Sequence, residues 1–203
     1  MKNLNKIYSI ILATLFCSTL STQSFTAIGT VNPAKYIPEQ KMIAFGSNGM
    51  VTTQHYLATK VGEDILNQGG NAYDAAIAIS FTLAVVLPRA GNIGGGGFMV
   101  LHDIKSKKNY AIDYREKAPL LSTTDMYLDE NGTVIPNKST LGYLSSGVPG
   151  TVAGMWAVHQ KFGSMEWEKL LRPAIKLASD GFKISPYMSD MLIKYNAKLS
   201  VFE

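Results

Sequence analysis

The apolar positions in the first half of the chain predict two neighbouring helices. From about Tyr56 to Asn67, apolar side chains recur at the three- and four-residue spacing of one helix face. Thr53 is placed to cap this helix, and Gly69-Gly70 would end it. From Ala72 to Leu87 the side chains are apolar nearly all round, which is typical of a buried helix.

Polar residues at the ends of this second stretch favour a core helix over a membrane span. Asn71 is a good N-cap, and Asp74 places a negative charge in the first turn, where it complements the helix dipole. The stretch is shorter than the roughly 20 residues that a spanning helix needs, and Pro88-Arg89 follows it directly. We therefore expect it to pack inside the protein.

The middle of the chain has sequence patterns that predict β-strands. Phe98–Leu101 and Tyr110–Tyr114 are short runs rich in aromatic and β-branched residues, and the polar turn between them predicts a β-hairpin. Two further strand pairs are predicted around turns, namely Met126–Leu128 with Thr133–Ile135, and Met42–Phe45 with Met50–Thr53.

The last part of the chain predicts helices again. One runs from about Thr151 to Lys161 before Gly163, and another from Glu166 to about Ser179 with a kink or break at Pro173. A third spans Pro186 to about Lys198. Helices at both ends and hairpins in the middle, without a strict alternation of strand and helix, predict an α+β fold.

The first residues, 1–24, have the pattern of a secretory signal peptide. Lys2 and Lys6 precede an apolar stretch from Ile7 to Leu20, and small and polar residues follow it. That stretch is short for a permanent membrane anchor. Cys17, the only cysteine, lies within this leader, so a periplasmic or secreted mature chain from residue 25 would contain no disulfide.

Composition indicates a globular protein, with 46% hydrophobic and 17% charged residues in a chain of 203. The net charge is +4, and without the two leader lysines it is +2, from 17 basic minus 15 acidic residues. The lysines are scattered, which argues against a nucleic-acid partner. His55, His102 and His159 lie in different elements, without a second ligand at metal-binding spacing, which argues against a metal.

The residues that say most about chemistry are the glycine run Gly91–Gly97 and Arg115. Four consecutive glycines suit a sharp turn or close backbone packing, and the Lys-Ser/Thr pair of a phosphate loop is missing after them. Arg115 follows the first predicted hairpin, where its planar guanidinium is well suited to hold a carboxylate. Alternatively, it only pairs with Glu116 or Asp113.

No nucleophile is evident from the residues. Ser145 and Ser146 lack the Gly-x-Ser-x-Gly elbow, and the histidines have no triad spacing. A threonine nucleophile at Thr52 or Thr53 would require a cut in the peptide bond before it, at the start of the fold. We therefore interpret these threonines as strand and cap residues.

Three segments together resemble a known family. They are Gly91 to Met99, Asp113-Tyr114-Arg115-Glu116-Lys117-Ala118-Pro119, and Ser146-Gly147-Val148-Pro149-Gly150-Thr151-Val152-Ala153-Gly154. In this order they resemble the N-terminal half of the large subunit of a γ-glutamyltransferase, also called glutathione hydrolase. The similarity runs from about Gly49 to the C-terminus.

This resemblance implies an N-terminal nucleophile hydrolase with a layered α/β/β/α sandwich, of which residues 25–203 would be the N-terminal portion of the large-subunit domain. It implies a precursor that cleaves itself, with the nucleophilic threonine opening a small subunit beyond Glu203. The chain would then be a fragment, incomplete as a fold and inactive alone.

The intact protein would hydrolyse or transfer the γ-glutamyl group of glutathione and related compounds through a γ-glutamyl-enzyme ester, without a metal or organic cofactor. Arg115 occupies the family position that grips the substrate's α-carboxylate. Two alternatives stay open. One is a non-catalytic remnant that associates with a separately encoded small subunit, and the other is a related amidase that removes acyl side chains from β-lactam antibiotics.

Overall fold

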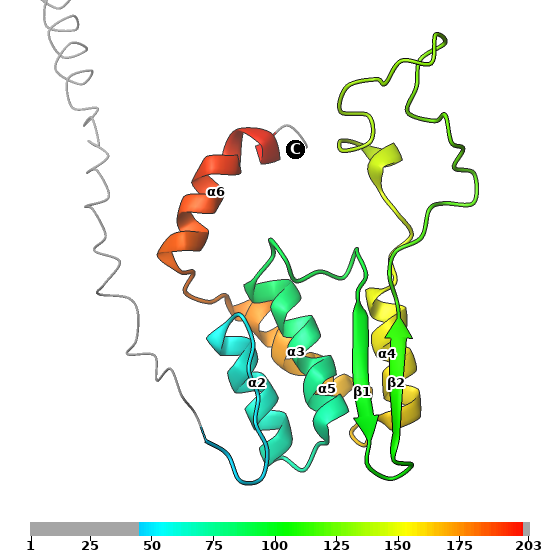
Figure 1. Cartoon of the computed structure of the whole chain (residues 1–203). Helices are drawn as coiled ribbons and strands as arrows, with labels where there is room; N and C mark the ends of the chain where they lie inside the picture. Colours follow the sequence, from blue (N-terminus) through cyan, green and yellow to red (C-terminus); the bar gives the residue numbers. More distant parts are fainter. Residues whose placement is uncertain (1–44, 201–203) are drawn as a thin grey trace, which may run out of the picture. The chain divides into compact units, whose positions relative to one another are not determined.

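The computed structural model describes residues 45–200 of the chain (Figure 1). The chain divides into two units, residues 43–184 and residues 185–203 together with 1–42. The predicted signal peptide, residues 1–24, and all but the last residue of the strand candidate Met42–Phe45 lie outside the described residues.

The first two predicted helices are confirmed as α2 (Tyr56–Asn67) and α3 (Ala72–Val86). The cap predicted for α2 is wrong, because the N-cap is His55, whose Nδ1 accepts a hydrogen bond from the Leu57 backbone N–H at 3.3 Å. The Thr53 hydroxyl instead donates to the carbonyl oxygen of His55. Thr53 therefore lies two residues before the N-cap and does not cap the helix.

Helix α3 is the centre of the larger unit. Its start is a capping box, in which the Asn71 side chain accepts from backbone N–H groups and the Asp74 carboxylate accepts from the Asn71 N–H. It packs against α2, against α4 (Thr151–Phe162) and against α5 (Trp167–Asp180). No helix within residues 45–200 is long and apolar enough to cross a membrane.

The buried core joins these helices to the hairpin. Its fully buried large side chains include Ile65, Ile77, Met155, Val158 and Leu170, which come from all four helices. Of the predicted kink or break at Pro173, the break is wrong, since α5 continues through this residue. Burial of Leu170 and Ala174 on either side of the proline holds the helix against the core.

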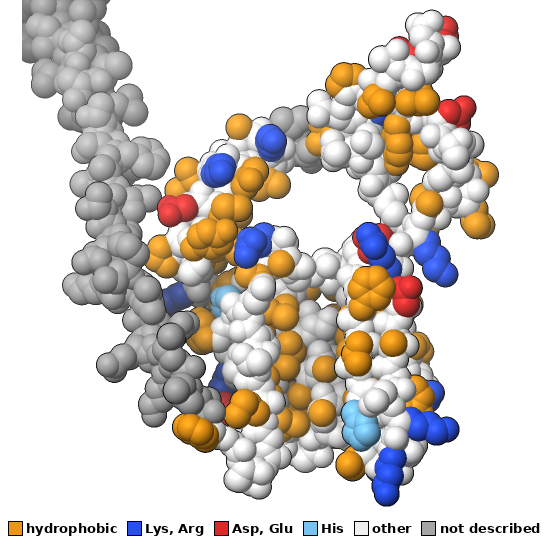
Figure 2. Space-filling model, viewed as in Figure 1, with side chains coloured by type: hydrophobic (Ala, Val, Ile, Leu, Met, Phe, Trp, Pro, Cys, Tyr) orange, Lys and Arg blue, Asp and Glu red, His pale blue; other side chains and the backbone are white. Residues whose placement is uncertain are grey.

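The first hairpin is confirmed as β1 (Phe98–Asp103) paired antiparallel with β2 (Lys108–Asp113). Alternate side chains point to opposite faces, so Met99 and Ile112 pack against the core. Phe98 and Val100 on the other face are 64% and 81% exposed, and hydrophobic side chains are visible over the hairpin in Figure 2. Helices and one two-stranded sheet confirm the α+β class.

Two of the predicted strand regions do not form strands. Met50–Thr53 has no strand, and the second hairpin is reduced to a single bridge between Leu128 and Val134. The segment from Lys117 to Val148 is closed at its base by another isolated bridge between these two residues. Besides the Leu128–Val134 bridge, a short 3₁₀ helix, η2 (Tyr143–Ser145), lies inside it.

In the other unit, the described residues form helix α6 (Pro186–Leu199). The Ser185 hydroxyl oxygen accepts from the Met188 N–H at 3.2 Å, and Pro186 occupies the first turn, where a missing N–H costs little. The predicted helix is therefore confirmed.

The His55 cap makes a pH-dependent stability prediction. Burial lowers the pKa of His55 below its ordinary value. The unfolded chain, with a pKa of about 6.5, then binds the proton more readily, so stability falls as pH drops through about 6.5 toward the folded-state pKa. His55→Asn keeps a capping acceptor but does not titrate, and it should flatten the change in urea midpoint between about pH 8 and about pH 5.5. His102→Asn, at an exposed histidine, is the control, and an equal flattening there would contradict the assignment.

Candidate functional site

The three segments that carry the family resemblance meet at one place. The carbonyl oxygen of Gly95 accepts hydrogen bonds from the N–H groups of Gly150 and Thr151, at 2.8 and 3.1 Å. The carbonyl oxygen of Gly97 accepts from the Tyr114 N–H at 3.1 Å. The glycine run thus bonds both to the start of α4 and to the residue that follows β2.

Asn92 and Thr151 hold the glycine turn on helix α4. The Thr151 hydroxyl donates to Asn92 Oδ1 at 2.9 Å, and the Gly95 N–H donates to the same oxygen, also at 2.9 Å. Thr151 is only 4% exposed. One amide oxygen therefore orders the turn and ties it to a buried hydroxyl on another element.

The glycines serve close packing around Tyr114. A Cβ added to Gly150 would lie 2.0 Å from the Tyr114 carbonyl oxygen, and one added to Gly154 would lie 2.4 Å from the Tyr114 Cβ. A Cβ on Gly97 would lie 2.9 Å from the Tyr114 ring. Burial raises the pKa of the Tyr114 phenol. The predicted role of the glycines, close backbone packing, is confirmed.

This packing makes Gly154→Ala a destabilising change, although alanine is favoured over glycine inside a helix by roughly 0.5–1 kcal/mol. The added methyl group meets Tyr114 Cβ and Cγ, which lie next to the backbone and cannot rotate away. Overpacking of this kind costs about 1–3 kcal/mol, so a net loss of stability is expected in urea unfolding. Gly94→Ala is the control because a Cβ there meets nothing within 4 Å. Equal unfolding midpoints for the two variants would refute the packing role.

Arg115 lies between two fixed points of the backbone. Tyr114 is bonded to Gly97, and Lys117 exchanges two backbone hydrogen bonds with Val148, at 3.1 and 2.8 Å. The Arg115 N–H itself donates to Asp113 Oδ1 at 3.0 Å. The peptide backbone that carries the guanidinium is therefore held from both sides.

A pocket with a volume of about 330 Å³ lies beside this segment. Asp113, Arg115 and Lys117 line it from the end of β2 onward, and basic and acidic side chains gather at this end of the hairpin in Figure 2. The remaining wall is mostly apolar or backbone and is formed by Ile112, Tyr114, Val148, Pro149, Gly150, Ala153, Gly154 and Ala157.

Arg115 lines this pocket and is exposed. Among residues 45–200 its guanidinium forms no hydrogen bond and no ion pair, and neither Glu116 nor Asp113 is its ion-pair partner. The planar geometry of its five donors matches that of a carboxylate.

The other residues that the sequence raised as candidates lie apart. His55 caps α2, His102 lies on β1 and His159 lies on α4, and no group of three or more His, Cys, Asp or Glu within the described part of the chain could hold a metal ion. The Ser145 hydroxyl donates to the Gly142 carbonyl, so it is used within its own turn.

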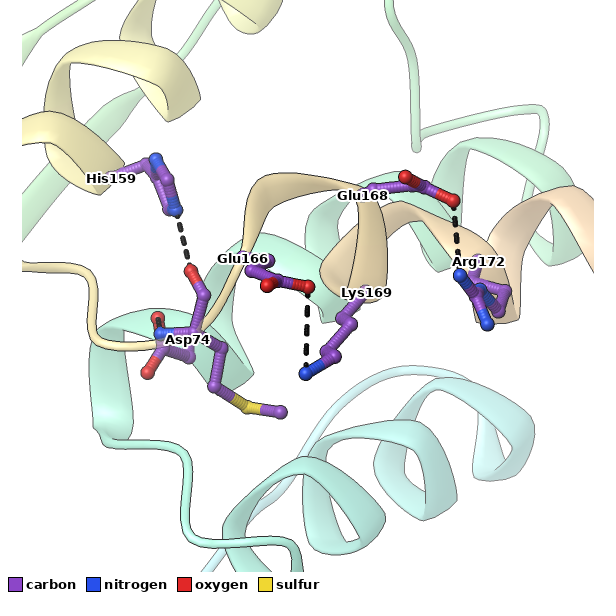
Figure 3. Close-up of polar contacts among 7 residues, drawn as sticks. Asp74, His159, Glu166, Glu168, Lys169 and Arg172 are labelled. Atoms are coloured by element: carbon purple, nitrogen blue, oxygen red, sulfur yellow. Dashed lines mark hydrogen bonds and ion pairs between the residues drawn. The ribbon is translucent and has the colours of Figure 1, made fainter.

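Asp74 has a larger structural role than the sequence indicated. Figure 3 shows it beside the connection between α4 and α5, where its carboxylate accepts from the Ser164 N–H at 3.0 Å and from the Met165 N–H at 3.4 Å. His159 Nε2 lies 2.8 Å from the Met165 carbonyl oxygen in the same connection. The carboxylate therefore supports the fold beyond the C-terminal end of α4 and does not line the pocket, which borders the N-terminal half of that helix.

The comparisons with known proteins agree with this arrangement. Solved structures that resemble the chain place its fold in the N-terminal nucleophile hydrolase class. The sequence model of the gamma-glutamyltranspeptidase family matches residues 58–203, and the chain belongs to that family.

Individual relatives define how much of the family protein is present. The glutathione hydrolase proenzyme of Pseudomonas sp. (strain A14) is 47% identical over 173 residues, which are 85% of this chain and 29% of the relative. The gamma-glutamyltranspeptidase of Helicobacter pylori matches with a TM-score of 0.73 and 50% identity, over 75% of this chain and 44% of that one. The cephalosporin acylase of Bacillus halodurans matches with a TM-score of 0.66 and 26% identity, over 83% and 32%. The chain thus spans under a third of the length of the Pseudomonas sp. (strain A14) relative.

Proposed function

We propose that this chain is the part of a glutathione hydrolase, or γ-glutamyltransferase, that binds the γ-glutamyl substrate through Arg115. The observation that carries the proposal is that Arg115 lines the pocket, while its guanidinium has no partner among the described residues and its backbone is held on both sides. Two parallel hydrogen bonds to the α-carboxylate would fix the orientation of the substrate.

The chemical step would require a nucleophile from another part of the protein. In the proposed reaction, a threonine hydroxyl attacks the γ-carbonyl carbon, the amine leaves with a proton, and water or an acceptor amine releases the γ-glutamyl group from the ester. A free threonine α-amino group would accept the hydroxyl proton. Arg115 would act on binding and orientation and would take no part in proton transfer.

The names of the relatives support two further parts of the proposal. Several are called proenzymes, which favours synthesis as a zymogen that is processed into subunits. Export to the periplasm or the exterior is proposed from the signal-peptide pattern of residues 1–24.

A related β-lactam side-chain acylase is the second candidate, because the cephalosporin acylase of B. halodurans shares the fold. Its 26% identity is about half of the 50% found for the H. pylori transpeptidase. The difference favours γ-glutamyl compounds as substrates. A non-catalytic remnant is the third candidate, and a measurement of hydrolytic activity tests it.

A hybrid proenzyme tests these candidates. In it, the matching stretch of this chain replaces the corresponding 173 residues of the Pseudomonas sp. (strain A14) protein. We expect the hybrid to cleave itself and to release cysteinylglycine from glutathione. A hybrid that matures but hydrolyses only an acylated cephalosporin would favour the acylase, and one that matures but hydrolyses neither compound would favour the remnant.

A further inference from the structure

Lys117 is a second cation at the Arg115 pocket. Residues 114–117 continue from strand β2 to the bridge at Lys117, and in extended backbone the side chains of residues i and i+2 lie on the same side. Both Arg115 and Lys117 line the pocket. Glu116, between them, does not line it, and its Oε2 would lie 2.6 Å from a Cβ added to Gly96. Both cations therefore line the pocket, whereas the Glu116 carboxylate lies at the glycine run.

The Lys117 ammonium is available for a ligand. The residue is exposed, and its side chain forms no ion pair or hydrogen bond with any of residues 45–200. Its backbone is nevertheless held by two hydrogen bonds to Val148. A lysine on a fixed backbone presents a point charge on a flexible stem, which can reach carboxylates at a range of distances.

The charges around the pocket favour a ligand with a net negative charge. Arg115 and Lys117 contribute two positive charges, and Asp113 contributes one negative charge, which already accepts the Arg115 N–H. The first turn of α4, the positive end of that helix, borders the same pocket at Gly150 and Ala153. The net charge of these three side chains is +1, so a ligand with a net negative charge is favoured over a neutral one.

We propose that Lys117 selects γ-glutamyl compounds that carry a further carboxylate beyond the α-carboxylate. This inference rests on the proposed function, in which Arg115 holds the α-carboxylate. Glutathione has such a second group at its glycine end, whereas γ-glutamylethylamide has none. Lys117 is thus a residue that determines specificity, while Arg115 binds the group that all γ-glutamyl substrates share.

The test measures the dissociation constants of two probes, S-methylglutathione and γ-glutamylethylamide, for the full 203-residue chain. Each probe is titrated into ¹⁵N-labelled protein, and the NMR spectrum reports binding. Wild type should bind the dicarboxylate about threefold to fivefold more tightly, the range of an exposed charge pair. Lys117→Gln should reduce this ratio to about one. Raising the salt concentration should also reduce the ratio in wild type. Lys108→Gln, an exposed lysine that does not line the pocket, is the matched control.

The outcomes separate this inference from the proposed function. An unchanged ratio in Lys117→Gln, or an equal loss in Lys108→Gln, overturns the role of Lys117. Arg115→Gln should lower the affinity for both probes by the same factor. If it weakens neither while Lys117→Gln still abolishes the preference, the carboxylate clamp at Arg115 is wrong and the role of Lys117 stands. If the wild-type chain binds neither probe, the KM values of the two probes in the hybrid proenzyme decide, and equal KM ratios for wild type and Lys117→Gln there overturn the role of Lys117.

Discussion

Replacing Asp74 by alanine is expected to lower the free energy of unfolding by about 2–4 kcal/mol. The carboxylate is completely buried and accepts hydrogen bonds from the N–H groups of Asn71, Ser164 and Met165 and from the Ser164 hydroxyl. Alanine would leave these donors without their acceptor, and each buried unsatisfied group costs about 1–3 kcal/mol before water or relaxation compensates. Urea unfolding of the chain and its variant measures the difference.

The loss of stability caused by Asp74→Ala should be smaller at acidic pH. Burial alone would raise the pKa of Asp74, but the hydrogen bonds from Ser164, Asn71 and Met165 outweigh it and hold the pKa below its ordinary value. The contribution of the carboxylate is therefore complete above the unfolded-state pKa of about 3.9 and is lost as pH falls through the folded-state pKa. The stability gap between wild type and variant should narrow over this range.

Asp180→Ala is the matched control for Asp74. The Asp180 carboxylate is exposed, and within residues 45–200 it pairs with Lys176 on the same helix and with its neighbour Ser179. Its removal should change the unfolding midpoint little, because exposed ion pairs contribute little. Equal losses for Asp74→Ala and Asp180→Ala would show that the buried network does not stabilise the fold.

The helices could be predicted because their signals are local. Asn71 and Asp74 lie three residues apart and form both halves of the capping box, and the apolar period of α2 gave its limits as Tyr56 and Asn67. The cap of α2 was missed because a histidine ring is a less common capping acceptor than a threonine hydroxyl. Only the three-dimensional structure shows that the Thr53 hydroxyl is already bonded to the His55 carbonyl.

The predicted second hairpin failed for an identifiable reason. The Asp129 side chain accepts the N–H groups of Asn131 and Thr133, which builds a local turn instead of an extended ladder. An isolated two-stranded hairpin is marginal without a hydrophobic face to pack. Phe98–Asp103 and Lys108–Asp113 had such a face, with Met99 and Ile112 against the core, and the region from Leu128 to Val134 did not.

The site could be predicted only in part. Arg115 was found from its motif, but spacing along the chain says nothing of the bonds from Gly95 to Thr151 or from Asn92 to Thr151, which join segments more than fifty residues apart. Lys117 carried a readable signal, since it lies two residues beyond Arg115 in an extended segment. That signal gained meaning only when both side chains were found on one pocket.

Arg115→Ala is expected to raise the KM for glutathione by about one to two orders of magnitude in the hybrid proenzyme. A charge-assisted hydrogen bond contributes roughly 1.5–3 kcal/mol, and about 1.4 kcal/mol corresponds to a factor of ten in binding. Arg115→Lys keeps the charge but loses the planar pair of donors, so its KM should fall between those of arginine and alanine. Steady-state hydrolysis of glutathione measures the three values.

Self-cleavage separates substrate binding from damage to the fold. It acts on a peptide bond of the protein itself, where there is no free α-carboxylate for Arg115 to hold, so Arg115→Ala should mature at the wild-type rate. Arg172→Ala is the control for loss of a positive charge, because Arg172 is exposed on α5 and pairs with Glu168 away from the pocket. If Arg115→Ala matured normally and kept the wild-type KM, Arg115 would not hold the α-carboxylate, and its open donors would need a different ligand.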